Sequence, residues 1–172
     1  ELFGNVPASI QVNGGNLTSD VIKDSATIAT TGNTDTYVLA PSAGTLDITY
    51  FSGVDALAAN DTNYITFSIT NLGQAGAGST AMLAATDANT TKATGGSAIS
   101  ANTRRTLTMN ATAGNLVVVE GDRLRIRAAV TNTLANTVTF PTYLLKFRIV
   151  NLPRILKTGN APAKQRNSLT KP

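Results

Sequence analysis

The chain has 172 residues and a mass of 17.8 kDa, with 42% hydrophobic residues, 14% charged residues and a formal net charge of +4. It contains no His, Cys or Trp, which removes the usual general base near neutral pH, the thiolate nucleophile, disulfides and the nitrogen and sulfur ligands of zinc. We therefore expect no enzyme, no cofactor and no metal site. No apolar run approaches the roughly 20 residues of a membrane-spanning helix, so we expect no membrane partner.

The length fits a single domain with its own hydrophobic core. Thr, Ala, Asn, Gly and Ser dominate the composition, which favours strands with polar outer faces over amphipathic helices. Strands are marked by alternating apolar and polar residues, most clearly at 45–50 and 65–70. In chain order, we expect strands within residues 21–28, 36–40, 45–50, 65–70, 81–85, 106–110, 116–119, 124–130 and 137–150.

About eight strands at these spacings are typical of an all-β sandwich, so we predict a single antiparallel sandwich with jelly-roll-like topology. Pro141 interrupts the last strand and predicts an edge position or a bulge there, because proline cannot donate a hydrogen bond to a sheet. The predicted limits are an N-terminal arm at 1–19, the sandwich at 20–150 and an extended basic tail at 151–172. The tail carries too little apolar surface to fold alone.

Charge is distributed unevenly along the chain. Residues 123–172 carry ten Lys or Arg and no acidic residue, whereas the rest carries four basic and ten acidic residues. Such a chain gains most when its basic part meets an acidic surface. Arg123, Arg125 and Arg127 alternate along one strand and so share a face, and Lys146 and Arg148 do the same on the last strand. The sequence leaves open whether the two rows form one patch or are only solvated outer faces.

We expect the basic rows, the tail and an apolar anchor in the N-terminal arm to bind a partner. The candidate partner-binding residues are Leu2, Phe3, Val6, Arg123, Arg125, Arg127, Lys146, Arg148, Arg154, Lys157, Lys164, Arg166 and Lys171. Nucleic acid is an unlikely partner although the sequence pI is about 9.6. Arg104, Arg105 and the tail could contact phosphates, but no aromatic residue is interleaved with the basic residues of the tail to stack on bases.

Two polar segments have a functional interpretation and a simpler one. The glycines at 73–78 suggest a phosphate-binding loop, but no Lys-Ser or Lys-Thr follows and the β pattern resumes, which favours a hairpin connection. Asp55, Asn60, Asp61 and Asn63 offer oxygen ligands for Ca²⁺, but Asn and Asp commonly bond the backbone of their own turns. Loop capping is therefore the favoured role for these four residues.

Two segments have a recognisable pattern: Asn-Asp-Thr-Asn-Tyr-Ile-Thr-Phe-Ser-Ile-Thr-Asn-Leu-Gly at 60–73 and Leu-Val-Val-Val-Glu-Gly-Asp-Arg-Leu at 116–124. Both segments resemble strands of tailed-phage virion proteins. The resemblance is one of pattern to jelly-roll decoration, cement and head-fibre proteins; it covers roughly residues 20–150 and excludes the basic tail. It implies a structural protein on the outer surface of a capsid, bridging copies of the major capsid protein. It also implies assembly with copies of itself, as a trimer or another small oligomer.

Other functions remain open at this point. One alternative is a carbohydrate-binding jelly-roll module of a phage fibre or adhesin, and another is a head–tail or tail structural subunit. A carbohydrate binder normally presents exposed Trp or Tyr for stacking on sugars. The chain has no Trp, and Tyr37, Tyr50, Tyr64 and Tyr143 all fall within or directly beside predicted strands.

Overall fold

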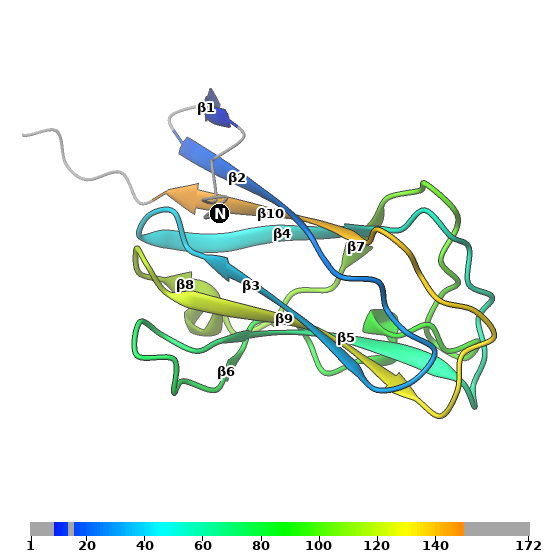
Figure 1. Cartoon of the computed structure of the whole chain (residues 1–172). Helices are drawn as coiled ribbons and strands as arrows, with labels where there is room; N and C mark the ends of the chain where they lie inside the picture. Colours follow the sequence, from blue (N-terminus) through cyan, green and yellow to red (C-terminus); the bar gives the residue numbers. More distant parts are fainter. Residues whose placement is uncertain (1–8, 14–15, 150–172) are drawn as a thin grey trace, which may run out of the picture.

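Two antiparallel sheets lie face to face in residues 9–13 and 16–149, the part of the chain that the computed structural model describes (Figure 1). Within these residues there is no α-helix, and two short 3₁₀ turns occur at Asp87–Asn89 and Ala113–Leu116. The strands are β1 (Ser9–Asn13), β2 (Asn16–Asp24), β3 (Asn33–Leu39), β4 (Gly44–Ser52), β5 (Tyr64–Asn71), β6 (Thr80–Ala81), β7 (Arg105–Leu107), β8 (Val117–Val118), β9 (Arg123–Thr131) and β10 (Thr142–Ile149). The predicted all-β antiparallel sandwich is confirmed.

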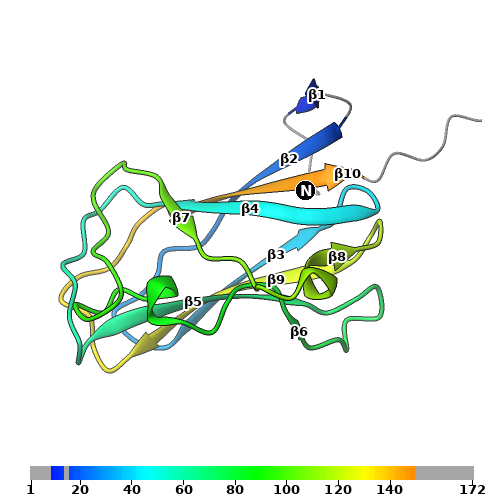
Figure 2. The ribbon, with the colours of Figure 1, turned by 180° about the vertical axis from the view of Figure 1, so that it is seen from behind.

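The larger sheet has the order β1-β2-β10-β4-β7, and β8 pairs with β4 beyond the end of β7. The smaller sheet has the order β3-β9-β5-β6. Successive strands from β2 to β5 alternate between the two sheets, and the chain crosses again between β9 and β10. Figures 1 and 2 show the two layers from opposite sides.

The core lies between the inner faces of the two sheets, where alternate residues of each strand are buried. Ile65, Phe67 and Ile69 of β5 project from one layer. Phe51 of β4 meets Phe67 with ring centroids 4.7 Å apart, and Tyr143 of β10 lies 5.4 Å from Phe51. Each fully buried aromatic ring contributes about 1.5–3 kcal/mol by removal from water, and the contact between Phe51 and Phe67 joins the two layers.

The N-terminal limit of the sheet differs from the prediction. Residues 9–13 form β1 and residues 16–19 begin β2, so the segment predicted as an arm overlaps two strands. β1 pairs with β2 in an antiparallel hairpin and extends the larger sheet at its edge.

The expectation for Pro141 was wrong. β10 begins at Thr142 and lies in the middle of the larger sheet, between β2 and β4. Pro141 therefore precedes the strand, where a residue without an N–H is tolerated, and its carbonyl accepts from Ser25 N–H at 2.8 Å. The register shift lies instead between β10 and β4, where Lys146 pairs with Ile48 and Phe147 with Leu46, so that the extra residue belongs to β4.

The predicted strand at 81–85 is shorter than expected. β6 ends at Ala81. Leu83 then forms an isolated antiparallel bridge with Met109, which follows β7 in the chain. Buried Asn89 fixes this crossing: its side chain donates to the carbonyls of Ala84 (2.9 Å) and Thr108 (2.8 Å) and accepts from Thr108 N–H (2.7 Å). The segment between β6 and β7 thus closes one side of the sandwich.

The two ends of the sandwich differ in what they carry. β10 ends and β2 begins at one end, on the left in Figure 1. At the other end Thr142 pairs with both Ser52 and Asp24, and the connections 25–32, 53–63 and 132–141 lie there. This end is called the distal end below.

Candidate functional site

The two predicted basic rows lie on opposite outer faces of the molecule. Arg123, Arg125 and Arg127 lie on β9 of the smaller sheet and alternate with buried residues. Lys146 and Arg148 lie on β10 of the larger sheet and also alternate with buried residues. Because the inner faces of the sheets pack on each other, the two rows point in opposite directions and form no common patch.

The row on β10 is neutralised by acidic residues of the flanking strands. Lys146 Nζ lies 3.1 Å from Asp20 Oδ2 on β2, and Arg148 Nη2 lies 2.9 Å from Asp47 Oδ1 on β4. The larger sheet therefore has little unpaired charge along this row. We interpret the row on β10 as a solvated outer face and not as an interface.

Arg127 on β9 is also paired within the fold. Asp35 lies directly opposite it on β3, and both carboxylate oxygens accept from the guanidinium, at 2.6 Å each. The hydrogen bonds from Arg127 lower the pKa of Asp35, and the same bonds raise the pKa of Arg127.

Arg123 and Arg125 form no salt bridge with any described residue. Arg123 stacks on the Tyr37 ring, 4.3 Å from its centroid. Arg125 makes one long bond of 3.5 Å to the Thr70 hydroxyl, and its Nε is buried without a hydrogen-bond partner. The guanidinium fork of Arg125 thus keeps donor capacity that a carboxylate would fill.

Two exposed apolar side chains accompany these arginines on the smaller sheet. Tyr37 pairs with Arg125 and Leu39 with Arg123 across β3 and β9, and they are 40% and 52% exposed. Arg123, Arg125, Tyr37 and Leu39 are called the arginine face below. Arginine and aromatic residues on a rigid surface are typical of the energetic centres of protein interfaces.

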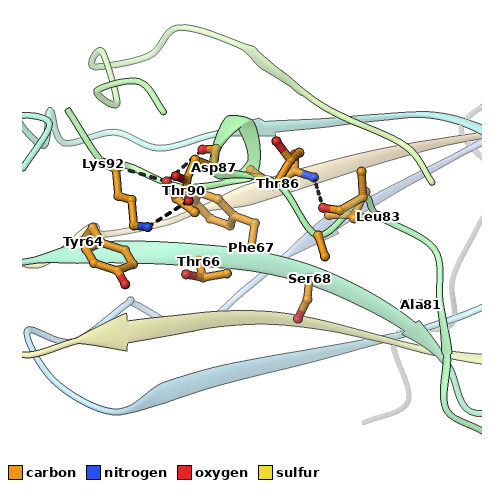
Figure 3. A pocket seen from close by; sticks show the side chains of 13 residues that line it. Tyr64, Thr66, Phe67, Ser68, Ala81, Leu83, Thr86, Asp87, Thr90 and Lys92 are labelled. Carbon is orange, nitrogen blue, oxygen red and sulfur yellow. Dashed lines mark hydrogen bonds and ion pairs between the residues drawn. The ribbon is translucent and has the colours of Figure 1, made fainter. Parts of the chain in front are cut away.

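A pocket of about 510 Å³ lies between β5 and the segment 81–92 (Figure 3). Tyr64, Thr66 and Ser68 line it from β5, and Asp87 and Lys92 line it from the other side. Lys92 Nζ lies 2.9 Å from Asp87 Oδ1 and 4.9 Å from the Tyr64 ring centroid. The hydrogen bond to Asp87 raises the pKa of Lys92. The carboxylate in the lining is thus ion-paired, and the pocket lacks the second carboxylate that acid–base hydrolysis requires.

Of the candidate calcium ligands, Asn60 caps its own turn as predicted, whereas Asp55 and Asp61 bond residues far along the chain. Asn60 Oδ1 accepts from the N–H groups of residues 62 and 63, at 2.8 Å each. Asp61 accepts from Thr94, and Asp55 accepts from the N–H and hydroxyl of Thr139. No group of three or more acidic, His or Cys residues within the described residues is placed to hold a metal ion.

The glycine-rich segment is a hairpin connection, as the sequence predicted. β5 and β6 pair antiparallel on either side of it. Gly73 and Gly76 adopt φ values of +66° and +76°, which glycine tolerates at no steric cost.

Arg105 is bonded within the fold, whereas Arg104 is exposed. The Arg105 guanidinium donates to the carbonyls of residues 88, 90 and 97, and burial lowers its pKa. Arg104 stacks on Tyr50 with its guanidinium carbon 4.0 Å from the ring centroid. Arg105 is therefore a structural residue that holds the segment between β6 and β7.

Several predicted partner-binding residues lie outside the described residues: Leu2, Phe3, Val6, Arg154, Lys157, Lys164, Arg166 and Lys171. Among the helical segments described, none has the length and apolar character needed to cross a bilayer. No protein-family model matches the chain, and comparison with curated proteins and with solved structures finds no significant match either.

Proposed function

We propose that this chain is a structural virion protein that binds the outside of a tailed-phage capsid and stabilises the shell by bridging neighbouring capsid subunits. The resemblance of residues 60–73 and 116–124 to decoration and cement proteins supports the virion location. The arginine face supports docking on a protein, with the major capsid protein as the partner. On this proposal the chain is a clamp and not an enzyme.

The arginine face is the observation that carries the docking proposal. Within the two basic rows, Arg127, Lys146 and Arg148 are paired with Asp35, Asp20 and Asp47, whereas Arg123 and Arg125 form no salt bridge with a described residue. An acidic side chain on a capsid subunit would satisfy the guanidinium of Arg125, and Tyr37 and Leu39 would be covered by the same contact.

The strand order supports the finer part of the fold prediction. The order β2-β10-β4-β7 faces β3-β9-β5-β6, an arrangement that two interleaved Greek keys produce in an eight-stranded jelly roll. A jelly roll leaves both outer faces free, so that one can dock while the other points to solvent.

The test is binding of purified chain to isolated capsid shells of the phage. Replacing both Arg123 and Arg125 by Ala should weaken binding by about 30-fold or more, because truncating a central interface residue commonly costs at least ~2 kcal/mol. Arg148→Ala is the matched control, since it removes an exposed arginine from the opposite outer face. Density for the chain on the outside of an icosahedral particle would locate the contact. The proposal would be contradicted if the shells did not bind the wild-type protein. It would also be contradicted if they bound the Arg123 and Arg125 double variant as tightly as Arg148→Ala.

The C-terminal segment has a separate role in the proposal, as a tether along an acidic surface of a neighbouring subunit. Its five basic residues and absence of acidic residues support this role. Each exposed ion pair contributes at most about 1 kcal/mol, so the pairs act together. Deletion of residues 152–172 should weaken shell binding at low salt and make binding less sensitive to salt. Equal binding by both forms at every salt concentration would assign docking to the sandwich alone.

A carbohydrate-binding module is the second candidate, and the pocket beside Tyr64 favours it. The pocket combines an aromatic ring with the hydroxyls of Thr66 and Ser68, a lining suited to sugars. Tyr143 is buried and can stack on no ligand. Binding to a glycan array that Tyr64→Ala abolishes would support this candidate, and absence of binding on an array of bacterial surface glycans would remove it.

A further inference from the structure

Three exposed apolar residues lie at the distal end of the sandwich. Ile22 is 55% exposed on β2, Val54 follows β4 and is 43% exposed, and Phe140 precedes β10 and is 74% exposed. Val54 N–H donates to the carbonyl of Thr139, which places it beside Phe140 in the fold. Exposed large apolar side chains in one region of a surface mark an interaction site.

A second pocket, of about 260 Å³, opens on the outer face of the larger sheet at this end. Ile22, Leu144 and Tyr50 lie side by side across β2, β10 and β4 and form its apolar wall. Ser52 and Thr142 line it from the ends of the same strands, and Asn102 and Arg104 line it from the segment before β7. A cavity of roughly 150 Å³ accepts benzene, so this pocket has room for a phenyl ring.

Phe140 is presented outward by a fixed backbone. Its φ of +45° lies in the left-handed region, which is unfavourable for a bulky residue. The neighbours on both sides are held: Asp55 accepts from the N–H and hydroxyl of Thr139, and the Pro141 carbonyl accepts from Ser25 N–H. Strain of this kind persists only where surrounding contacts impose it, and it points to a functional constraint.

We propose that the distal end is a self-association surface, in which Phe140 of one copy enters the pocket formed by Ile22, Tyr50 and Leu144 on a second copy. The projecting ring and the receiving pocket lie close together on the same chain, because Thr142 lines the pocket two residues after Phe140. A contact between identical copies needs such self-complementarity, since each copy must supply both halves.

Charges around the pocket are self-complementary as well. Arg104 lies on the β7 side, stacked on Tyr50 and without a salt bridge to a described residue. Asp24 is exposed on the β2 side, where Thr142 donates to it at 2.7 Å. Two copies related by a two-fold axis would bring the Arg104 of each toward the Asp24 of the other. The apolar contact and the charge pattern therefore indicate the same partner, a second copy of this chain.

The inference concerns the chain alone and does not rest on capsid docking. Sedimentation velocity of the purified full-length protein should show association that rises with concentration. Phe140→Ala should raise the dissociation constant by about 30-fold or more. Ser52→Trp, which fills the pocket and leaves Phe140 intact, should do the same. Leu39→Ala is the control, because it removes a similarly exposed apolar side chain from the opposite end of the sandwich.

Mixing the two variants tests the pairing directly. Phe140→Ala keeps the pocket and Ser52→Trp keeps the ring, so a mixture should form a one-to-one complex that neither variant forms alone. A photoreactive benzophenone at position 140 should cross-link to residues lining the pocket of a second, isotopically labelled copy. A monomeric protein at all concentrations, cross-links elsewhere, or equal weakening by Leu39→Ala would overturn the proposal.

Discussion

Asp35→Asn should destabilise the sandwich in a manner that depends on pH. Two hydrogen bonds of 2.6 Å join Asp35 to Arg127, and the two side chains are 24% and 31% exposed. Sheltered bonds to charged groups contribute ~1.5–3 kcal/mol, whereas exposed ion pairs contribute at most about 1 kcal/mol. Partial screening by solvent places the loss at about 1 kcal/mol at neutral pH, or about 3 °C in Tm.

The pH dependence follows from the pKa of Asp35, which Arg127 holds below the ordinary value of 3.8. The unfolded chain takes up its proton near the ordinary value, and the folded chain does so at lower pH. Stabilisation by the ionised pair is therefore complete above the ordinary pKa and is lost as the pH falls through the lowered one. Urea denaturation of wild type and variant, from neutral pH to the lowest pH at which the wild type folds, should show their difference shrinking below about pH 4.

A double-mutant cycle with Arg127→Gln isolates the pair from other effects of each substitution. The coupling energy should be about 1 kcal/mol at neutral pH and should vanish in acid. Asp47→Asn is the control, because its pair with Arg148 is more exposed and should contribute less. A difference between wild type and Asp35→Asn that stays constant with pH would refute this account of the pair.

Three further substitutions test the packing. Asn89→Ala should cost about 1–3 kcal/mol in chemical denaturation, because the Thr108 N–H loses its partner and the carbonyls of Ala84 and Thr108 each lose one of two donors, whereas exposed Asn136→Ala should cost under about 1 kcal/mol. Gly44→Ala should cost about 1–3 kcal/mol, since its Cβ would overlap the Arg148 carbonyl oxygen, and Gly114→Ala, with open space around it, should be nearly neutral. Phe140→Gly should stabilise the monomer by about 0.5–1 kcal/mol by relieving the positive φ, and a loss of stability there would contradict the strain.

Period-two alternation predicted most of the strands because each face of a sandwich strand meets a different environment. It assigned Leu124, Ile126 and Ala128 to the interior and Arg123 to the surface, as the structure has them. It gave no information on the edges, where strands are short. β6 and β8 have two residues each in this structure, and β8 pairs with β4, which lies far from it in the sequence.

The candidate site was harder to predict because its properties depend on neighbours across strands. Sequence spacing placed Arg123, Arg125 and Arg127 on one face but could not show which of them has an acidic partner. Asp35 lies 92 positions from Arg127, and only the register between β3 and β9 brings them together. Phe140 had no sequence signal beyond the following proline, since its exposure comes from the connection that precedes β10.

The acidic residues before position 123 and the basic residues after it are brought together by folding. Residues 16–149 contain nine basic and nine acidic residues, so the sandwich is neutral although its last strands are basic. The acidic residues of β2, β3 and β4 pair with the basic residues of β9 and β10. Long-range attraction to an acidic partner must therefore come from the residues beyond 149, which add five positive charges. The arginine face acts at contact distance instead, where hydrogen bonds to a carboxylate are directional and less sensitive to salt. Truncation of the tail should accordingly lower the salt dependence of docking, whereas Arg125→Ala should lower affinity at every salt concentration.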